Sequence, residues 1–186
     1  MTNHHIISAT QKWLTSFIIE YNICPFAHRE QQRNSIRYRV ASSGQLDSTL
    51  ETLIEECVYL DEHTETETTL LILPKGFTNF EDYLDMLAMA EQLLLLQDYE
   101  GVYQLASFHP DYCFEDDVNN GSDTEIDPAN YTNRSPYPML HIIREESLER
   151  ALSHYPDPEK IPVRNIKLTR EMGLKNLQQL LAACYK

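Results

Sequence analysis

"TTLLILP", residues 68–74, is the stretch that decides the fold. It is a continuous run of β-branched and aliphatic residues that ends at a proline. Such a run is typical of a strand that is buried on both faces. Strands of this kind occur where helices cover both sides of a sheet, so we expect the rest of the chain to be arranged around this segment.

Three further segments are predicted to be strands. "SIRYRVA" (35–41) alternates, with Ile36, Tyr38 and Val40 on one face and two arginines on the other. "VYQLASF" (102–108) and "PMLHII" (138–143) are the third and fourth predicted strands.

Helical periodicity predicts the helices that pack around these strands. They lie over about 5–21, about 46–62, the segment after "PKGFTNFED" (74–82), about 145–153 and about 167–184. Thr78 and Glu81 have the spacing of a capping box, and Gly173 is expected to interrupt the last helix. "HYPDPEKIPVRN" (154–165) is predicted to be a loop. The succession of elements predicts one α/β (or α+β) layered domain over residues 1–186, with about four strands in a mixed sheet packed by helices.

The connection between the third and fourth strands is unusually long. Residues 109–137 show neither helical nor strand periodicity, and loops of this length tend to be functional or disordered. From Gly76 to Asn133 there is no lysine or arginine, while thirteen aspartates and glutamates accumulate. We therefore predict a long acidic loop that ends in the more rigid, proline-containing "YTNRSPYP" (131–138).

Composition and charge exclude several classes of function. The 186 residues are 42% hydrophobic, as in globular proteins, and carry a net charge of −14. This charge argues against nucleic acid as the main partner. No apolar run is long enough to span a membrane and the N-terminus is not a secretory signal, so we expect a cytoplasmic protein. The four cysteines form no CxxC pair and are interpreted as free thiols, with Cys57 and Cys184 buried in helices.

Three candidate functional residues, His109, Arg144 and Glu145, follow predicted strands, where ligands of α/β proteins usually bind, and the others lie in loops. His109 is the best candidate for a general acid or base, and Cys24 and Glu145 are candidates to assist it. The candidates for holding an anion are Arg134, Arg144, Asn133 and Ser135. Each role has a structural alternative: a histidine bonded to loop backbone, arginines paired with carboxylates, a buried inert thiol, and a glutamate favoured at a helix start. His141, inside the fourth strand, is interpreted as a hydrogen-bonded core histidine.

Metal and cofactor sites are not expected. Three residues separate Cys24 from His28, and three separate His109 from Cys113. Four such ligands would suit zinc. The two pairs are far apart and fit no established spacing pattern, so we predict no metal site. The sequence also lacks GxGxxG, GxxxxGK[ST], GxSxG and HExxH, and we predict no nucleotide cofactor.

Four segments together carry a family resemblance. They are "CPFA" (24–27), "ETTLLILP" (67–74), "QLASFHPDY" (104–112) and "NRSPYPMLHIIRE" (133–145). In this order and spacing they resemble the bacterial proteins grouped as domain of unknown function 1415. The resemblance covers nearly the whole chain, from the helix containing Trp13 to "IPVRNIKLTREMGL" (161–174). It implies a small, single-domain, soluble bacterial protein and assigns no catalytic residue.

Two functional hypotheses remain open from the sequence. The first is a cytosolic enzyme that acts on a small anionic metabolite through the histidine and arginines above. The second is a non-catalytic binding or adaptor protein that presents the acidic segment 111–127 to a protein partner. The site also depends on strand direction: if the fourth strand runs antiparallel to the third, Arg134 lies beside His109, and if it runs parallel, Arg144 and Glu145 take that place.

Overall fold

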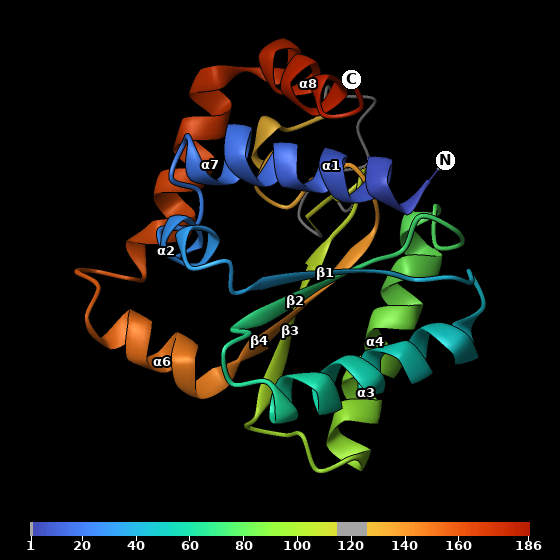
Figure 1. The fold of residues 1–186 in the computed structure, drawn as a ribbon. Helices are drawn as coiled ribbons and strands as arrows, with labels where there is room; N and C mark the ends of the chain where they lie inside the picture. The colour runs from blue at the N-terminus through green and yellow to red at the C-terminus, as the bar shows by residue number, and fades with distance from the viewer. Residues whose placement is uncertain (1, 115–125) are drawn as a thin grey trace.

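The structure, a computed structural model, describes residues 2–114 and 126–186 of the chain. A four-stranded mixed sheet lies between two groups of helices (Figure 1), which confirms the predicted α/β layers. The sheet and the helices on its first face are β1 (Ile36–Val40), α3 (Leu46–Glu62), β2 (Thr68–Ile72), α4 (Phe80–Leu96), β3 (Tyr103–Phe108) and β4 (Met139–Arg144). The helices on the other side and at the ends are α1 (Asn3–Trp13), the π-helix η1 (Leu14–Ile19), α2 (Ala27–Gln32), the 3-10 helix η2 (Pro128–Thr132), α6 (Glu145–Ser153), α7 (Lys160–Met172) and α8 (Leu174–Ala183).

The strands are arranged in the order β1-β2-β4-β3. β1 and β2 are parallel and joined by α3, whereas β4 is antiparallel to both of its neighbours. Met139 at the start of β4 pairs with Phe108, and Arg144 at its end pairs with Tyr103. The fourth strand is therefore antiparallel to the third, and the loop that contains Arg134 reaches β4 at the end of the sheet where His109 lies.

The central strand β2 is buried on both faces over its whole length, as predicted. On one face, Leu71 belongs to a core that α3 and α4 complete. On the other face, Ile72 packs in a second core with side chains of α1, η1 and α8. Burying an aliphatic side chain of this size contributes about 1.5–3 kcal/mol, so the two cores hold the layers together.

Two predicted helix boundaries were wrong. α7 begins at Lys160, inside the segment predicted to be a loop. Pro162 lies in its first turn, where backbone N–H groups have no acceptor within the helix, so a proline can occupy this position. The N-cap of α4 is Asn79 rather than Thr78, since its side chain accepts hydrogen bonds from the backbone of residues 81 and 82 at 2.9 and 3.2 Å. The predicted interruption at Gly173, which has φ of 78°, is confirmed. Cys57 and Cys184 are buried, also as predicted.

Polar contacts support the sheet on its α3 side. Arg37 donates two hydrogen bonds to Glu56, at 2.6 and 3.1 Å, and the Glu56 side chain is only 2% exposed.

Beyond the ends of β1 and β2, the two loops that follow these strands touch at Gly44 and Gly76. A Cβ atom on Gly44 would lie 2.7 Å from the backbone of the second loop, so this approach requires glycine.

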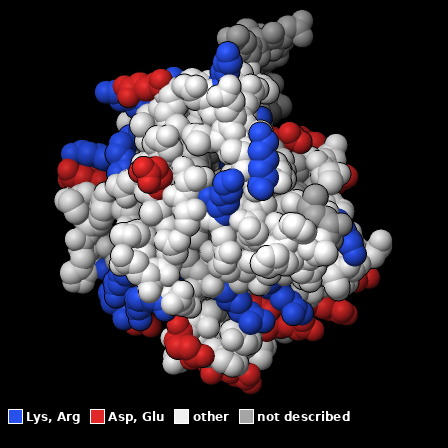
Figure 2. Space-filling view, turned by 45° about the horizontal axis from the view of Figure 1, so that its top comes forward, with Lys and Arg blue, Asp and Glu red and all other residues white. Residues whose placement is uncertain are grey.

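The opposite side of the molecule carries an unusual charge distribution. Neither α1 nor α8 contains an aspartate or glutamate, although the chain as a whole has a net charge of −14. Figure 2 looks onto this side and shows a largely uncharged surface with basic side chains near its centre. Within the described part of the chain, no helix has the length and apolarity needed to cross a membrane.

Candidate functional site

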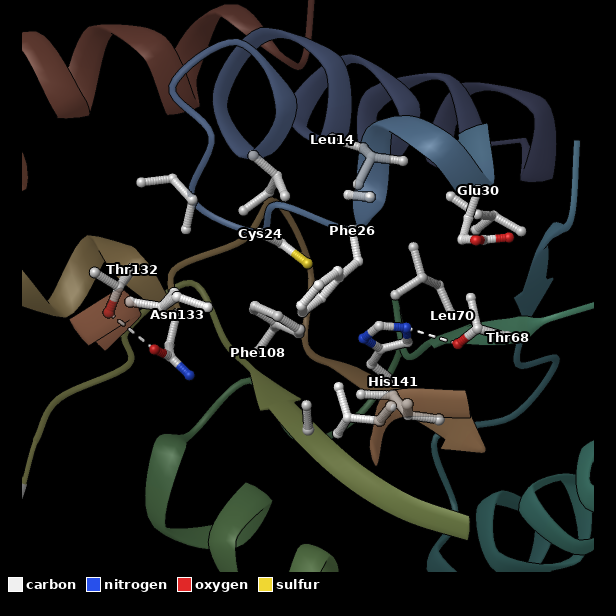
Figure 3. A pocket seen from close by; sticks show the side chains of 18 of the residues that line it. Leu14, Cys24, Phe26, Glu30, Thr68, Leu70, Phe108, Thr132, Asn133 and His141 are labelled. Carbon is white, nitrogen blue, oxygen red and sulfur yellow. Dashed lines mark hydrogen bonds between the residues drawn. The ribbon is translucent and has the colours of Figure 1, made fainter. Parts of the chain in front are cut away.

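A pocket of about 390 Å³ lies between the sheet and the N-terminal helices. Its floor comes from the sheet face opposite α3 and α4, and its roof from α1, η1 and the segment before α2 (Figure 3). Residues of α6 and α7 form one wall. Most of its lining is apolar. The main apolar side chains are Trp13, Leu14, Ile18, Phe26, Leu70, Ala106, Phe108, Leu148, Ile161 and Ile166.

The roof of the pocket contains the π-helical turn η1. The backbone N–H of Glu20 donates to Thr15 at 3.2 Å, one residue further back than in an α-helix. Leu14 and Ile18, both in this turn, are buried and line the pocket. π-helical turns are rare and are frequently found at functional sites. The wider turn therefore shapes the roof directly above the floor formed by the sheet.

His141 is a polar group in the floor of this apolar pocket. The Thr68 hydroxyl, which has one hydrogen, donates it to the backbone carbonyl of Ile142. It must therefore accept the 2.7 Å hydrogen bond from Nε2 of His141. The other ring nitrogen, Nδ1, is then unprotonated, and it has no hydrogen-bond partner among the described residues. Burial lowers the pKa of His141 to about 4, so the ring is neutral near neutral pH.

Cys24 and Asn133, two of the predicted site residues, line the same pocket. In Figure 3 the sulfur of Cys24 points into the pocket, near Phe26 and Phe108. Burial raises the pKa of the Cys24 thiol, so it is held in the protonated, weakly nucleophilic form. The Asn133 side chain accepts from the Thr132 hydroxyl at 2.9 Å and donates to the Ser107 carbonyl at 3.3 Å.

His109 lies outside the pocket and is fully buried. Its Nε2 donates to the backbone carbonyl of Phe77 at 2.9 Å, and its Nδ1 accepts from the backbone N–H of Asp111 at 3.0 Å. Burial lowers the pKa of His109, which favours this neutral form. Both ring nitrogens are therefore engaged with loop backbone, the structural alternative considered for this residue. Its role in acid–base chemistry stays a prediction.

Arg134 and Ser135 lie in the loop beside His109. Nε of Arg134 donates to the carbonyl of Tyr112 at 3.1 Å, and the guanidinium lies over the Tyr131 ring at 5.0 Å. Ser135 is buried and donates to the carbonyl of Tyr137 at 2.6 Å. Among the described residues, Arg134 thus contacts a backbone carbonyl and an aromatic ring, and it joins the two ends of the long loop.

Arg144 and Glu145 lie at the opposite end of β4. Arg144 donates to the carbonyls of Leu60 and Thr66 and to the Tyr103 hydroxyl, so it satisfies carbonyl groups at and beyond the end of α3. Glu145 begins α6. The structure therefore divides the predicted site residues among three places: the pocket, the loop around His109 and the far end of β4. Their predicted catalytic and anion-binding roles stay predictions.

The described residues contain no cluster of ligands for the zinc site considered as an alternative. Among residues 2–114 and 126–186 there is no group of three or more histidine, cysteine, aspartate or glutamate side chains that could hold a metal ion. His28 lies exposed on α2, where its Nε2 is hydrogen-bonded to Gln32 at 3.2 Å, whereas His109 is buried.

Comparison with known proteins shows the family. The model of a family described as proteins of unknown function (DUF1415) matches residues 5–179, which is most of the chain. The chain belongs to this family. No curated protein and no solved structure was found to match it. The DUF1415 match supports the resemblance seen in the sequence and assigns no role to any pocket residue.

His141 and Thr68 are the pocket residues that sequence reasoning missed as site candidates. The sequence signal was a histidine within an apolar strand, which predicted a hydrogen-bonded core residue. That is correct for Nε2, which bonds to Thr68. Nδ1 is available only because a pocket lies beside it, and the roof of that pocket is formed by helices more than a hundred residues away in sequence.

Proposed function

We propose that this DUF1415 protein binds a small, mainly apolar molecule that donates a hydrogen bond to Nδ1 of His141. The observation that carries the proposal is an apolar pocket of about 390 Å³ with a neutral acceptor that has no partner among the described residues. Ligand sites are commonly concave, mostly apolar pockets of roughly 300–1,000 Å³ with few polar groups that fix the orientation of the ligand.

The two features select the ligand in different ways. Displacing water from the apolar lining favours any apolar molecule that fits. A ligand without a donor leaves the His141 acceptor desolvated and unpaired, at a cost of about 1–3 kcal/mol. A ligand with a hydroxyl or N–H group at this position avoids that cost, so the histidine makes the pocket selective.

The chemistry of the pocket favours binding over catalysis. A histidine whose pKa is lowered to about 4 is a weak base near neutral pH. The Cys24 thiol, whose pKa is raised by burial, is a poor nucleophile. The adaptor hypothesis concerns segment 111–127, most of which lies outside the described residues. Acid–base catalysis through His109, cytoplasmic residence and bacterial origin stay predictions.

Titration with an uncharged dye tests whether the pocket binds apolar molecules. N-phenylnaphthylamine gains fluorescence in apolar surroundings, and we expect saturable binding to the native chain. Ala106→Phe fills the pocket from its floor and should abolish that binding. Ala88→Phe is the matched control, since Ala88 is exposed on α4, on the other side of the sheet. Dye binding that survives Ala106→Phe with the fold intact contradicts the proposal.

A second titration tests the hydrogen bond to His141. Naphthol and naphthalene have nearly the same shape, but only naphthol has a donor. We expect naphthol to bind more tightly by about 0.5–1.5 kcal/mol, the net value of one hydrogen bond. The difference should disappear in His141→Leu. Equal affinities in the native chain would show that Nδ1 does not orient the ligand.

A further inference from the structure

A second hollow lies beside the apolar pocket, between α2 and α6. This hollow, the vestibule, has a volume of about 640 Å³ and is lined by Pro25, Phe26, Arg29, Glu30, Arg33, Glu67, Ser147, Arg150, Ala151, His154 and Tyr155. Phe26, Glu30, Glu67, Ser147 and Ala151 also line the apolar pocket, so the two cavities share a wall and a junction. A molecule longer than the apolar pocket would have to pass these shared residues to reach the vestibule.

The vestibule brings together three arginines. Arg29 and Arg33 come from α2 and its C-terminal end, and Arg150 comes from α6. Their side chains are 73%, 52% and 62% exposed, and their ion pairs with glutamates are long, at 3.6, 3.5 and 3.3 Å. Long ion pairs of exposed arginines contribute about 0–1 kcal/mol each, so the guanidinium groups can also contact a bound anion at little cost.

The two glutamates of the vestibule differ in their surroundings. Glu30 accepts a 2.7 Å hydrogen bond from the Ser35 hydroxyl and lies between Arg29 and Arg33, so its charge is already compensated. Glu67 has no ion-pair partner among the described residues and lies at the junction of the two cavities. The lining thus carries three guanidinium groups against two carboxylates, in a chain with a net charge of −14.

We propose that the ligand is an amphiphilic anion, with its apolar part in the pocket and its carboxylate or phosphate in the vestibule against Arg29, Arg33 and Arg150. Planar guanidinium groups match both kinds of head group through paired hydrogen bonds. The assignment rests on the proposed function, because the apolar part occupies the pocket described above. Glu67 opposes the head group, and its position at the junction limits how far the anion can withdraw toward the pocket.

Displacement of the bound dye by decanoate and by methyl decanoate tests the assignment. The two probes share an apolar chain, and only decanoate carries a charge. We expect decanoate to bind roughly fivefold to tenfold more tightly at low salt, with a smaller ratio at high salt. The triple variant Arg29→Gln, Arg33→Gln, Arg150→Gln should bring the ratio close to one, while Lys175→Ala, which removes an exposed charge on α8, should leave it unchanged. Glu67→Gln should raise the affinity for decanoate.

The outcomes separate this inference from the proposed function. If the dye binds and both probes displace it equally, the pocket binds apolar molecules and the anionic head group is refuted. If methyl decanoate displaces the dye more effectively, or the triple variant keeps the native ratio, the vestibule arginines have no such role. If the native chain binds no dye, the proposed function itself fails. Where decanoate is preferred, the same experiment with an alkyl phosphate distinguishes a phosphate from a carboxylate head group.

Discussion

Replacing His141 by glutamine should remove a specific part of the pH dependence of stability. His141 has its pKa lowered to about 4 in the folded chain, against 6.5 for an exposed histidine. As the pH falls, the unfolded chain takes up this proton first, so protonation favours unfolding. The wild-type chain therefore loses stability as the pH falls from about 6.5 to about 4, whereas glutamine does not titrate.

The size of this loss follows from the two pKa values. At about pH 5, nearly all unfolded chains but only about a tenth of folded chains carry the proton, which corresponds to about 2 kcal/mol relative to about pH 7.5. Urea unfolding of both chains at the two pH values measures it. All other titrating groups are common to both proteins and cancel in the comparison. Glutamine can still donate to Thr68, so its side chain suits the site.

His5→Gln is the control for this measurement, because His5 is exposed on α1 and stays in water on folding. We expect this variant to keep the wild-type pH dependence. The refuting result is a His141→Gln variant whose loss of stability between about pH 7.5 and about pH 5 matches the wild-type loss to within about 0.5 kcal/mol. His141 would then not be held neutral by burial. The neutral ring on which the proposed function depends would then lose its support.

Three further substitutions test the fold around the site. Arg37→Ala leaves the buried Glu56 carboxylate without its main partner and should lower the free energy of unfolding in urea by about 3 kcal/mol. A decrease below about 1 kcal/mol would contradict the described pair. Asn79→Ala removes the cap of α4 and should lower the free energy of unfolding by about 1 kcal/mol, with an unchanged value arguing against the cap. Gly44→Ala forces the loops at Gly44 and Gly76 apart and should cost about 1–3 kcal/mol; an unchanged midpoint of thermal unfolding would show that the loops separate freely.

The strands could be predicted from the sequence because their signals are local. The alternation around Tyr38 and the aliphatic run at Leu70 both appear within a few residues, and both strands occur where they were expected. Their order could not be predicted in the same way. The insertion of β4 between β2 and β3 results from pairing between distant segments, and the sequence left its direction open. The start of α7 was missed because Pro162 was interpreted as a loop residue, although a proline fits the first turn of a helix.

The candidate site was harder to predict than the fold. Cys24 and Asn133 were chosen from the sequence and both line the pocket, while His109 and Arg144 are held by backbone carbonyls in other places. Sequence shows which residue types could carry chemistry, but not which of their polar atoms are already satisfied. For His141 that distinction rests on the single hydrogen of Thr68, which only the three-dimensional contacts reveal.

The position of β4 has a consequence for the growing polypeptide. β1, β2 and β3 are all complete by residue 108, yet β2 and β3 are not neighbours in the finished sheet. Until residues 139–144 emerge from the ribosome, β2 and β3 each keep an unpaired row of N–H and C=O groups on the side that β4 later occupies. Such rows invite pairing with other chains, and the closing strand arrives late. A fragment that ends before residue 144 should therefore aggregate rather than form a smaller version of the domain.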